Sequence, residues 1–528
     1  MNCDTGVAVG PEKGKSRKPL VYLVGAGPGD PGLITVRGKQ LLERAEVVVY
    51  DYLANKKFLQ YVPKGAEFIY VGKKGGVHHA CTQEEINQLL VERARAGRTV
   101  VRLKGGDPFI FGRGGEEIEE LVKAGIPFEV VPGVTSATAA ATYAGIPITH
   151  RRFTSTVAFI TGHEDPTKPD SRVAWDKIAT GIGTLVIYMG IKNLPAITAN
   201  LIKYGRDPNT PVAVVHWAST AGQRTVIGTL ATITEVVQAA KIRPPSIIVV
   251  GEVVSLRDTI NWFEKRPLFG KRVLVTRTRE QASELVNRLE EVGADCLEFA
   301  TISIEPLESF EELDLELARI GQYDWLVFTS INAVSHFFGR LLEQGMDARD
   351  LHGPRIAVVG RTTAERLADF GIKADLLPDE FTGEGLAASL LAQGMHGKKI
   401  LIPRAAQARE VLPKTLQEAG AAVTVVPVYR NVVPGVEDGS AREALRREFL
   451  EHRVDVITFT SSSTVTNFLK LLAPSGPEEL QELLNGVTVA AIGPITARTA
   501  EKHGLTVHVQ PATHTIPELV DSIVEHCI

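Results

Sequence analysis

Two aspartates at the ends of apolar runs are the first residues whose positions suggest chemistry. Asp30 lies in the glycine-rich stretch "LVGAGPGDPGLITVRG" (23–38), which predicts a strand that enters a ligand-binding turn. Asp51 ends the next apolar run, "AEVVVYD", where a dinucleotide site has its ribose-binding acid. Such a site needs a third glycine where Asp30 stands, however, and Pro28 and Pro31 lack amide donors that a pyrophosphate uses. The turn therefore argues against a dinucleotide.

Two further glycine-rich turns follow predicted strands. The stretch "RLKGGDPFIFGRGGEE" (102–117) carries Asp107, and "VPGVTSATAAATYAGIPITHR" (131–151) offers small hydroxyl residues. Each alone could be an ordinary turn at the end of a strand. Because ligands of α/β sheets bind at the carboxyl ends of the strands, the three turns together predict one shared binding site.

The composition excludes several classes of partner and location. The chain of 528 residues has a net charge of −4, so no broad basic field indicates a nucleic acid or an anionic membrane. Its four cysteines are far apart, which predicts free thiols and no metal site. The N-terminal residues lack the apolar region of a signal peptide, and no stretch is apolar enough to span a membrane. We expect a soluble, cytoplasmic protein.

Short apolar runs and amphipathic stretches alternate along the chain, which predicts an α/β fold that positions these turns. The pattern breaks at "NWFEKRPLFGKR" (261–272), which predicts a junction between domains. Beyond it, three pairs of segments resemble each other: 270–299 and 397–426, 324–338 and 455–469, and 355–372 and 488–505. The offsets of 127, 131 and 133 residues predict one unit that occurs twice, as two similar lobes with a cleft between them.

Six motifs of the first half occur together in one known family. They are "VGAGPGDPGLIT", "VVVYD", "VGKK", "RLKGGDPFIFGRGGEE", "PGVTSATAAATYAGIPITHR" and "YMG". Over about 18–262 the chain resembles the uroporphyrinogen-III C-methyltransferases of the tetrapyrrole methylases. The resemblance implies a two-subdomain tetrapyrrole methylase fold, S-adenosyl-L-methionine as methyl donor and uroporphyrinogen III as substrate. A sulfonium is positively charged and has no phosphate, so a carboxylate and prolines in its glycine loop are compatible with it.

The same resemblance gives residues their roles. The implied cofactor-binding positions are Pro28, Gly105, Gly106, Asp107, Ile110, Thr135, Ser136, Met189 and Ala218, the last replacing a glycine of the family. Asp51 matches the proposed proton acceptor and Lys73 the proposed proton donor. The carboxylates of the substrate are expected to meet a basic set: Arg102, Lys104, Arg113, Arg151 and Arg152. Each of these acids and cations could equally be an ordinary solvated side chain with no role in the site.

Five motifs of the repeat resemble a second family. "VLVTRTREQASEL", "VFTSINAV", "AVVGRTTAERL", "ITFTSSSTVTNF" and "AAIGPITARTA" are similar to uroporphyrinogen-III synthase over about 270–528. That family closes linear hydroxymethylbilane into a ring with inversion of one pyrrole. Tyr429 matches a tyrosine suggested to assist loss of the hydroxyl group, although a packed tyrosine fits equally well. The candidate substrate contacts are Thr329, Ser330, Asn332, Thr363, Thr460, Ser461, Ser462 and Thr496.

These resemblances predict a bifunctional enzyme, a transferase fused to a lyase, that makes uroporphyrinogen III and methylates it twice to precorrin-2. The expected parts are a flexible tail (1–17), the methylase (18–262), a linker (263–269) and a bilobal α/β synthase (270–528). One synthase lobe is expected at about 303–430 and the other from 270–302 with 431–528. A homodimer through the methylase half is implied, and precorrin-2 could go to siroheme or cobalamin. Two alternatives stay open: a methylase of a later corrinoid intermediate, or an NAD-dependent dehydrogenase fused to a two-lobed ligand-binding module.

Overall fold

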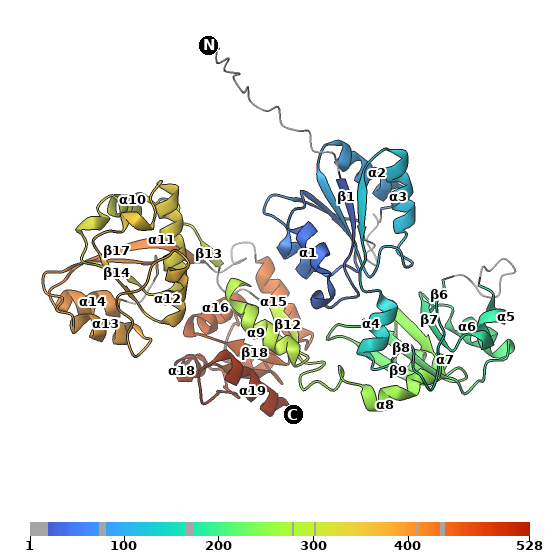
Figure 1. Cartoon of the computed structure of the whole chain (residues 1–528). Coiled ribbons are helices and arrows are strands. Elements are labelled where there is room, and N and C mark those ends of the chain that lie inside the picture. Colours follow the sequence, from blue (N-terminus) through green and yellow to red (C-terminus); the bar gives the residue numbers. More distant parts are fainter. Residues whose placement is uncertain are drawn as a thin grey trace, which may run out of the picture. The chain divides into compact units, whose positions relative to one another are not determined.

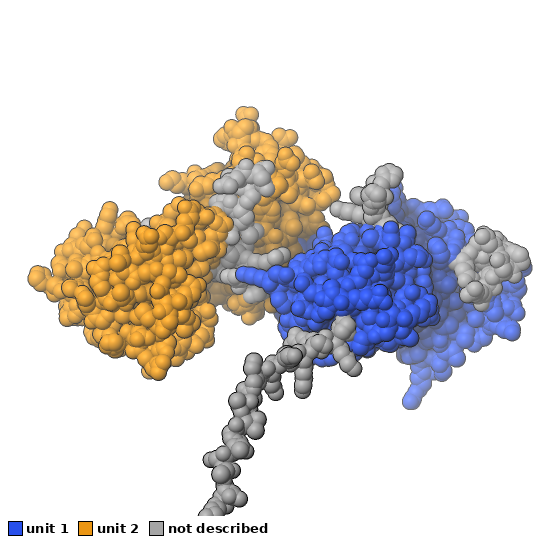
Figure 2. Space-filling model, turned by 90° about the horizontal axis from the view of Figure 1, so that it is seen from above, with its two compact units in different colours: residues 1–271, 289–295, 527–528 blue, residues 272–288, 296–526 orange. Residues whose placement is uncertain are grey.

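The computed structural model describes residues 20–72, 81–163, 173–276, 279–299, 303–407, 410–432 and 439–528. The chain forms two compact units, coloured separately in Figure 2. Unit 1 comprises Met1–Lys271, Leu289–Asp295 and Cys527–Ile528, and unit 2 comprises Arg272–Arg288 and Cys296–His526. Among the described residues, no helix has both the length and the apolar character needed to cross a bilayer.

The first sheet of unit 1 is wholly parallel, in the order β3-β2-β4-β1-β5. Its strands are β1 (Leu20–Gly25), β2 (Val47–Tyr50), β3 (Glu67–Tyr70), β4 (Thr99–Lys104) and β5 (Phe128–Val131). Helix α1 (Val36–Leu42) covers one face, and α2 (Gln83–Arg95) and α3 (Gly114–Lys123) cover the other (Figure 1). Because both faces are covered, the strands are continuous apolar runs rather than alternating ones.

Alternation of side chains along β1 explains how one strand supplies both cores. Val21 and Leu23 pack with α2 and α3, whereas Val24 packs with α1. Helix α2 begins at a capping box, in which Thr82 accepts from the Glu85 amide and Glu85 accepts from the Thr82 amide. The sheet is thus built so that the carboxyl ends of β1, β2, β4 and β5 lie along one edge.

The second sheet of unit 1 is mixed, in the order β6-β7-β10-β8-β9. Its strands are β6 (Val157–Thr161), β7 (Thr184–Tyr188), β8 (Pro211–His216), β9 (Arg224–Thr229) and β10 (Ser246–Val250). The alanine-rich helix α4 (Ser136–Tyr143) packs on one face. The other face is covered by α5 (Trp175–Gly181), α6 (Leu194–Lys203) and α7 (Ile233–Ala239), and the short α8 (Arg257–Ile260) follows β10 (Figure 1).

One sheet of unit 2 has the order β12-β11-β18-β19. Its strands are β11 (Arg272–Val275), β12 (Asp295–Glu298), β18 (Val456–Phe459) and β19 (Thr488–Ala491). The helices of this part of the chain are α9 (Arg279–Glu291), α15 (Ser440–Leu450), α16 (Ser462–Leu472), α17 (Pro477–Leu483), α18 (Pro494–Lys502) and α19 (Ile516–Cys527). Phe449, Phe459 and Phe468 fill its core.

The other sheet of unit 2 has the order β13-β17-β16-β14-β15. Its strands are β13 (Ser303–Glu305), β14 (Trp325–Phe328), β15 (Arg355–Val358), β16 (Lys399–Ala405) and β17 (Ala422–Val432). Its helices are α10 (Glu311–Leu317), α11 (Ile331–Glu343), α12 (Arg361–Ala368), α13 (Gly383–Leu391) and α14 (Val411–Glu418) (Figure 1). Phe328, Phe337 and Phe338 are fully buried in its core.

The internal repeat agrees with the two sheets strand by strand, but the copies are crossed. By the sequence match, β11 and β12 correspond to β16 and β17, β18 to β14, and β19 to β15. The order β12-β11-β18-β19 therefore equals the order β17-β16-β14-β15. One sheet thus contains segment 270–299 together with segments 455–469 and 488–505. The other sheet contains segment 397–426 together with segments 324–338 and 355–372.

Candidate functional site

The three glycine-rich turns of unit 1 meet around one cavity of about 320 Å³. It lies at the carboxyl ends of the first sheet and is also lined by Tyr188 and Val215 of the second sheet and by Trp217, which directly follows β8. All nine residues that the sequence assigns to the cofactor line it: Pro28, Gly105, Gly106, Asp107, Ile110, Thr135, Ser136, Met189 and Ala218. The structure thus brings this predicted set together, from segments as far apart in the chain as 28 and 218.

Close backbone approach explains the glycines of this site. Gly27 and Gly106 exchange two backbone hydrogen bonds, of 3.2 and 2.7 Å, and both have a positive φ that favours glycine. A Cβ on Gly105 would lie 2.4 Å from the Cβ of Leu53, just beyond Asp51. The backbone itself therefore forms much of the cavity wall.

Asp30, which stands in place of the third glycine of a dinucleotide turn, is used within the protein. Its Oδ1 accepts from the Gly32 amide at 2.7 Å and so caps a short 3₁₀ helix (Pro31–Leu33). Its Oδ2 accepts from the Tyr143 hydroxyl at 2.6 Å, and its amide donates to Ser219 Oγ at 3.2 Å. The pKa of the Tyr143 hydroxyl is raised, mainly by burial and secondly by the nearby Asp30 carboxylate. The hydroxyl therefore keeps its proton and donates it in this hydrogen bond. Asp30 therefore fixes the turn rather than binding a ribose or phosphate.

Asp107 joins the second and third turns. Its Oδ1 accepts from the Phe109 amide at 2.8 Å, and its Oδ2 accepts from the Gly133 amide at 3.0 Å. Gly133 precedes Thr135, whose hydroxyl lies 2.5 Å from the Tyr188 hydroxyl. Tyr188 also accepts from the Ala137 amide at 3.2 Å, in the first turn of α4. The tyrosine therefore caps this helix from the second sheet.

The cations that line the cavity are already paired. Arg102, only 3% exposed, contacts Asp51 and Glu117 at 3.3 Å each. Lys104 donates to Glu117 at 2.6 Å. The pKa of its ammonium group is lowered, mainly by burial and secondly by the positive charge of the neighbouring Arg102. Arg113 pairs with Glu116 at 2.6 Å. The predicted contacts of Arg102 and Lys104 with substrate carboxylates are therefore not supported by this burial and pairing.

Glu117 is a site residue for which the sequence reasoning gave no role. It is fully buried on α3 and accepts from Lys104, from Arg102 and, at 3.2 Å, from Gln83 Nε2 through a single oxygen, Oε1. Its other oxygen has no hydrogen-bond partner among the described residues. The residue lies inside the quoted motif "GRGGEE", but only the tertiary structure shows that it accepts hydrogen bonds from two buried cations.

A second, apolar cavity of about 500 Å³ adjoins the first. The two cavities share the lining residues Asp51, Leu53, Ser136, Tyr188, Met189, Pro245 and Ser246. The side chain of Asp51 is about a quarter exposed, and its Oδ1 accepts from the Leu53 amide at 3.1 Å. A carboxylate held in this way lies where two ligands would meet.

Other predicted residues of unit 1 lie elsewhere. Lys73 falls outside the described residues, so its role stays a prediction. Arg151 and Arg152 are exposed on a turn closed by the His150–Thr154 bridge and do not line either cavity. Among the described part of the chain, no group of three or more His, Cys, Asp and Glu side chains is arranged to hold a metal ion.

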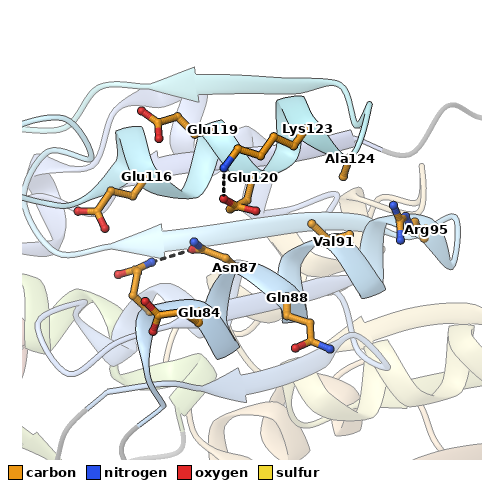
Figure 3. Close-up of a pocket in the computed structure, with 11 residues that line it drawn as sticks. Glu84, Asn87, Gln88, Val91, Arg95, Glu116, Glu119, Glu120, Lys123 and Ala124 are labelled. Atoms are coloured by element: carbon orange, nitrogen blue, oxygen red, sulfur yellow. Dashed lines mark hydrogen bonds and ion pairs between the residues drawn. The ribbon is translucent and has the colours of Figure 1, made fainter.

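A groove of about 620 Å³ between α2 and α3 is a weaker candidate. Its polar lining side chains include Glu84 and Gln88 on α2 and Glu116 and Glu119 on α3 (Figure 3). Lys123 contacts Glu120 at 2.6 Å within it. The groove runs along helix surfaces rather than at the ends of strands, and its charges are those of a solvated helix face.

In unit 2 the predicted hydroxyl residues lie where helices follow strands. Ser330 caps α11 by accepting from the Ala333 amide at 3.1 Å, and Ser461 caps α16 through a capping box with Thr464. Thr329, Asn332, Thr460 and Ser462 are neighbours of these caps and are partly exposed. Thr363 and Thr496 are buried inside α12 and α18, at 3% and 5% exposure, and this placement does not support their predicted contact with a substrate.

Tyr429 lies on β17 with its hydroxyl 3.3 Å from Ser330 Oγ. Its ring stacks on His336 with a centroid distance of 5.4 Å, and the side chain is 6% exposed. Two residues that the sequence assigned to the synthase site, Tyr429 and Ser330, are thus in contact. His336 was missed because nothing in its motif distinguishes it from a core position of α11.

These features define a class of protein. A ligand site built from glycine turns between two sheets is followed by a pair of similar α/β sheets made from crossed repeats. The model of the family "Tetrapyrrole (Corrin/Porphyrin) Methylases" matches residues 20–234, and that of "Uroporphyrinogen-III synthase HemD" matches residues 283–521.

Individual proteins are similar over the same ranges. "Porphyrin biosynthesis protein HemD" of Ruminiclostridium josui is 39% identical over 506 residues, which cover 96% of this chain and 98% of that protein. "S-adenosyl-L-methionine-dependent uroporphyrinogen III methyltransferase" of Methanosarcina barkeri is 54% identical over 240 residues, 46% of this chain and 94% of that protein. In the crystal structure of the native form of uroporphyrin III C-methyl transferase from Thermus thermophilus, the chain is 42% identical in sequence to this one. The match covers 45% of this chain and 99% of that chain, with a TM-score of 0.39. The chain belongs to the tetrapyrrole methylases in its first half and to the uroporphyrinogen-III synthases in its second. The fold class and the fused enzyme class predicted from the sequence are thereby confirmed.

Proposed function

We propose that the chain cyclises hydroxymethylbilane to uroporphyrinogen III and then methylates this product twice to precorrin-2. The observation that carries the methylase assignment is the cavity at the strand ends of unit 1, where all nine expected cofactor residues gather. S-Adenosyl-L-methionine is the proposed methyl donor, as in the name of the Methanosarcina barkeri relative.

The charges of the cavity suit a sulfonium better than a pyrophosphate. Arg102, Lys104 and Arg113 are the cations among the described lining residues, and each has a carboxylate partner. None of the described lining cations is therefore left to balance a phosphate, whereas Asp107 adds a further negative charge. This balance also disfavours the alternative of an NAD-dependent dehydrogenase.

When bound, the sulfonium supplies an activated methyl group and its own leaving group, so we propose no metal for this step. We propose that Pro28, Gly105, Gly106 and Asp107 hold the donor, and that the macrocycle occupies the adjoining apolar cavity. A carbon–carbon bond forms on the ring, and a proton must leave the macrocycle. Asp51 lies on both cavities and is the proposed acceptor of that proton.

For the synthase half we propose that carboxylates of the linear substrate bind near helix N-termini of unit 2. Helices α11, α12, α16 and α18 each follow a parallel strand, so their free amides face the strand ends. Tyr429, in contact with Ser330, is the proposed residue that assists loss of the hydroxyl group. The domain limits 18–262 and 270–528, and a homodimer through the methylase half, stay predictions.

The test is to measure binding and both activities on the full chain. We expect calorimetric titration to detect S-adenosyl-L-methionine and not NADH, and hydroxymethylbilane with the methyl donor to yield precorrin-2. Uroporphyrinogen III should accumulate when the donor is omitted. Binding of NADH without S-adenosyl-L-methionine, or absence of ring closure, would contradict the proposal.

A further inference from the structure

A buried glutamine links three segments behind the cofactor cavity. Gln223 ends the loop between β8 and β9 and is 3% exposed. Its Oε1 accepts from the Ser219 amide at 2.9 Å. Its Nε2 donates to the Tyr143 carbonyl at 3.1 Å and to Glu264 Oε1 at 2.8 Å. Both donor hydrogens and the acceptor of this amide are therefore used, each toward a different segment.

Two of these contacts lead to the glycine loop. Ser219 and Tyr143 are the side chains that bind Asp30, at 3.2 and 2.6 Å. A Cβ on Gly29 would lie 2.7 Å from a methyl of Thr220, so the loop 217–223 packs directly against the glycine turn. Both sides of this contact line the cofactor cavity: the glycine turn through Pro28, and the loop through Trp217 and Ala218.

The loop needs outside support to keep its shape. Trp217 and Ser219 have φ values of 46° and 62°, in the left-handed region that side chains other than glycine rarely adopt. Gln223 holds Ser219 from within the loop. The conformation that brings Trp217 and Ala218 to the cavity is therefore held by contacts that do not themselves touch it.

The third contact of Gln223 leads to the junction between the halves. Glu264 Oε1 also accepts from Thr225 Oγ1 at 2.6 Å, and its Oε2 pairs with Arg257. The neighbouring Phe263 is 5% exposed and packs on the Tyr143 ring at a centroid distance of 4.7 Å. Glu264 lies in the segment expected to be a linker and beyond residue 234, where the match to the methylase family ends.

We propose that Gln223, held by Glu264, is a positioning residue for the cofactor cavity. It fixes the loop 217–223 against the Asp30 turn, and so sets the separation of the two walls that enclose the methyl donor. The methylase therefore extends to the junction residue Glu264. This inference rests on the proposed binding of S-adenosyl-L-methionine in that cavity.

The test replaces Gln223 in the full chain by methionine, which keeps its length and removes its amide. We expect Gln223→Met, which removes all three of these hydrogen bonds, to raise the Kd and the KM for S-adenosyl-L-methionine at least about tenfold, since one buried hydrogen bond alone is worth roughly that factor. The kcat at saturating donor and the KM for uroporphyrinogen III should stay near the wild-type values. A merely structural role would instead lower kcat through loss of active protein, and would leave KM unchanged.

Gln88→Met is the matched control, because Gln88 Nε2 also donates to a glutamate, Glu92, at 2.9 Å, but on an exposed face of α2. It should leave all constants unchanged. Glu264→Gln should raise the KM for the donor by itself, and its effect in the Gln223→Met background should be smaller than in the wild type, since the contact with Gln223 is then already lost while those with Thr225 and Arg257 remain.

Wild-type donor affinity in folded Gln223→Met, or a loss of kcat alone, would overturn the inference. If this variant does not fold, Tyr143→Phe tests the same chain of contacts by removing only the hydroxyl on Asp30, and an unchanged KM would overturn the inference there. Failure of the wild-type chain to bind S-adenosyl-L-methionine would instead overturn the proposed function itself.

Discussion

Asp51 is the residue on which the proposed methyl transfer depends most directly. It lies on both cavities of unit 1, and its two oxygens are held by the Leu53 amide and by Arg102. Arg102 is in turn held by Glu117, which also neutralises Lys104. Because an uncompensated buried charge is costly, this set works as a unit that keeps the acid in place beside the apolar cavity.

The variant Asp51→Asn tests the proposed proton acceptor. We expect methyl transfer to fall roughly 10²–10⁴-fold, because the amide keeps the size of the side chain and loses the basic oxygen. The affinity for S-adenosyl-L-methionine should remain near that of the wild type. Rates can be measured with uroporphyrinogen III and labelled donor. Asp176→Asn, on the exposed surface of α5, is the control, and a parental rate in Asp51→Asn would leave Asp51 as a plain strand-end acid.

Single residues also show how far the sequence could lead. The cofactor positions came from the resemblance of whole motifs to the tetrapyrrole methylases, and some of them, such as Pro28 and Asp107, also lie in glycine turns that follow apolar strands. The pairing of Lys104 with Glu117 could not be predicted, because it depends on how α3 packs beneath β4. The same holds for Gln223, whose motif carries no signal and whose three partners lie far apart in the chain.

At the scale of elements, the site is made by turns that must approach each other closely. The turns after β1 and β4 are joined by the Gly27–Gly106 backbone pair, and the turn after β4 presses on the one after β2 at Gly105. The pattern of apolar runs predicted the strands and their shared edge, since both faces of a parallel sheet are buried. It could not predict that the Asp30 carboxylate would serve as a helix cap.

Gly105→Ala tests this close approach. The added Cβ would lie 2.4 Å from Leu53 Cβ and 3.1 Å from its backbone carbon, so the turn that carries Asp51 must shift. Overpacking of this kind costs about 1–3 kcal/mol, and we expect methyl transfer to fall about tenfold or more while ring closure is unchanged. Gly181→Ala is the control, because its added Cβ would meet nothing within 4 Å. Wild-type methyl transfer in Gly105→Ala would show that the turn can yield without moving Asp51.

At the scale of the whole molecule, the repeat and the junction set the organisation. The crossed repeat means that β11 and β12 share a sheet with β18 and β19, so the synthase cannot be divided at the midpoint of its repeat. The sequence matches alone indicated the repeat but not which copies share a sheet, and the expected lobes, about 303–430 and 270–302 with 431–528, came from the resemblance to the synthases. At the junction, Glu264 is bound to Gln223, whereas Leu268 is fully buried and its amide donates to the Val292 carbonyl at 2.9 Å.

These contacts locate the cut that should separate two working enzymes. We expect fragment 1–265 to methylate uroporphyrinogen III, because it keeps Glu264 and the supports of the cofactor cavity. Fragment 266–528 should close hydroxymethylbilane, because it keeps Leu268 with the Val292 turn and both sheets of the crossed repeat. A cut after Leu256 is the comparison, since it removes Arg257 and Glu264 from the first fragment and should weaken donor binding there. The fragments are assayed separately and then mixed, with circular dichroism to establish folding. If neither fragment folds, or if 266–528 closes no ring, the chain is one inseparable enzyme rather than two enzymes joined at this segment.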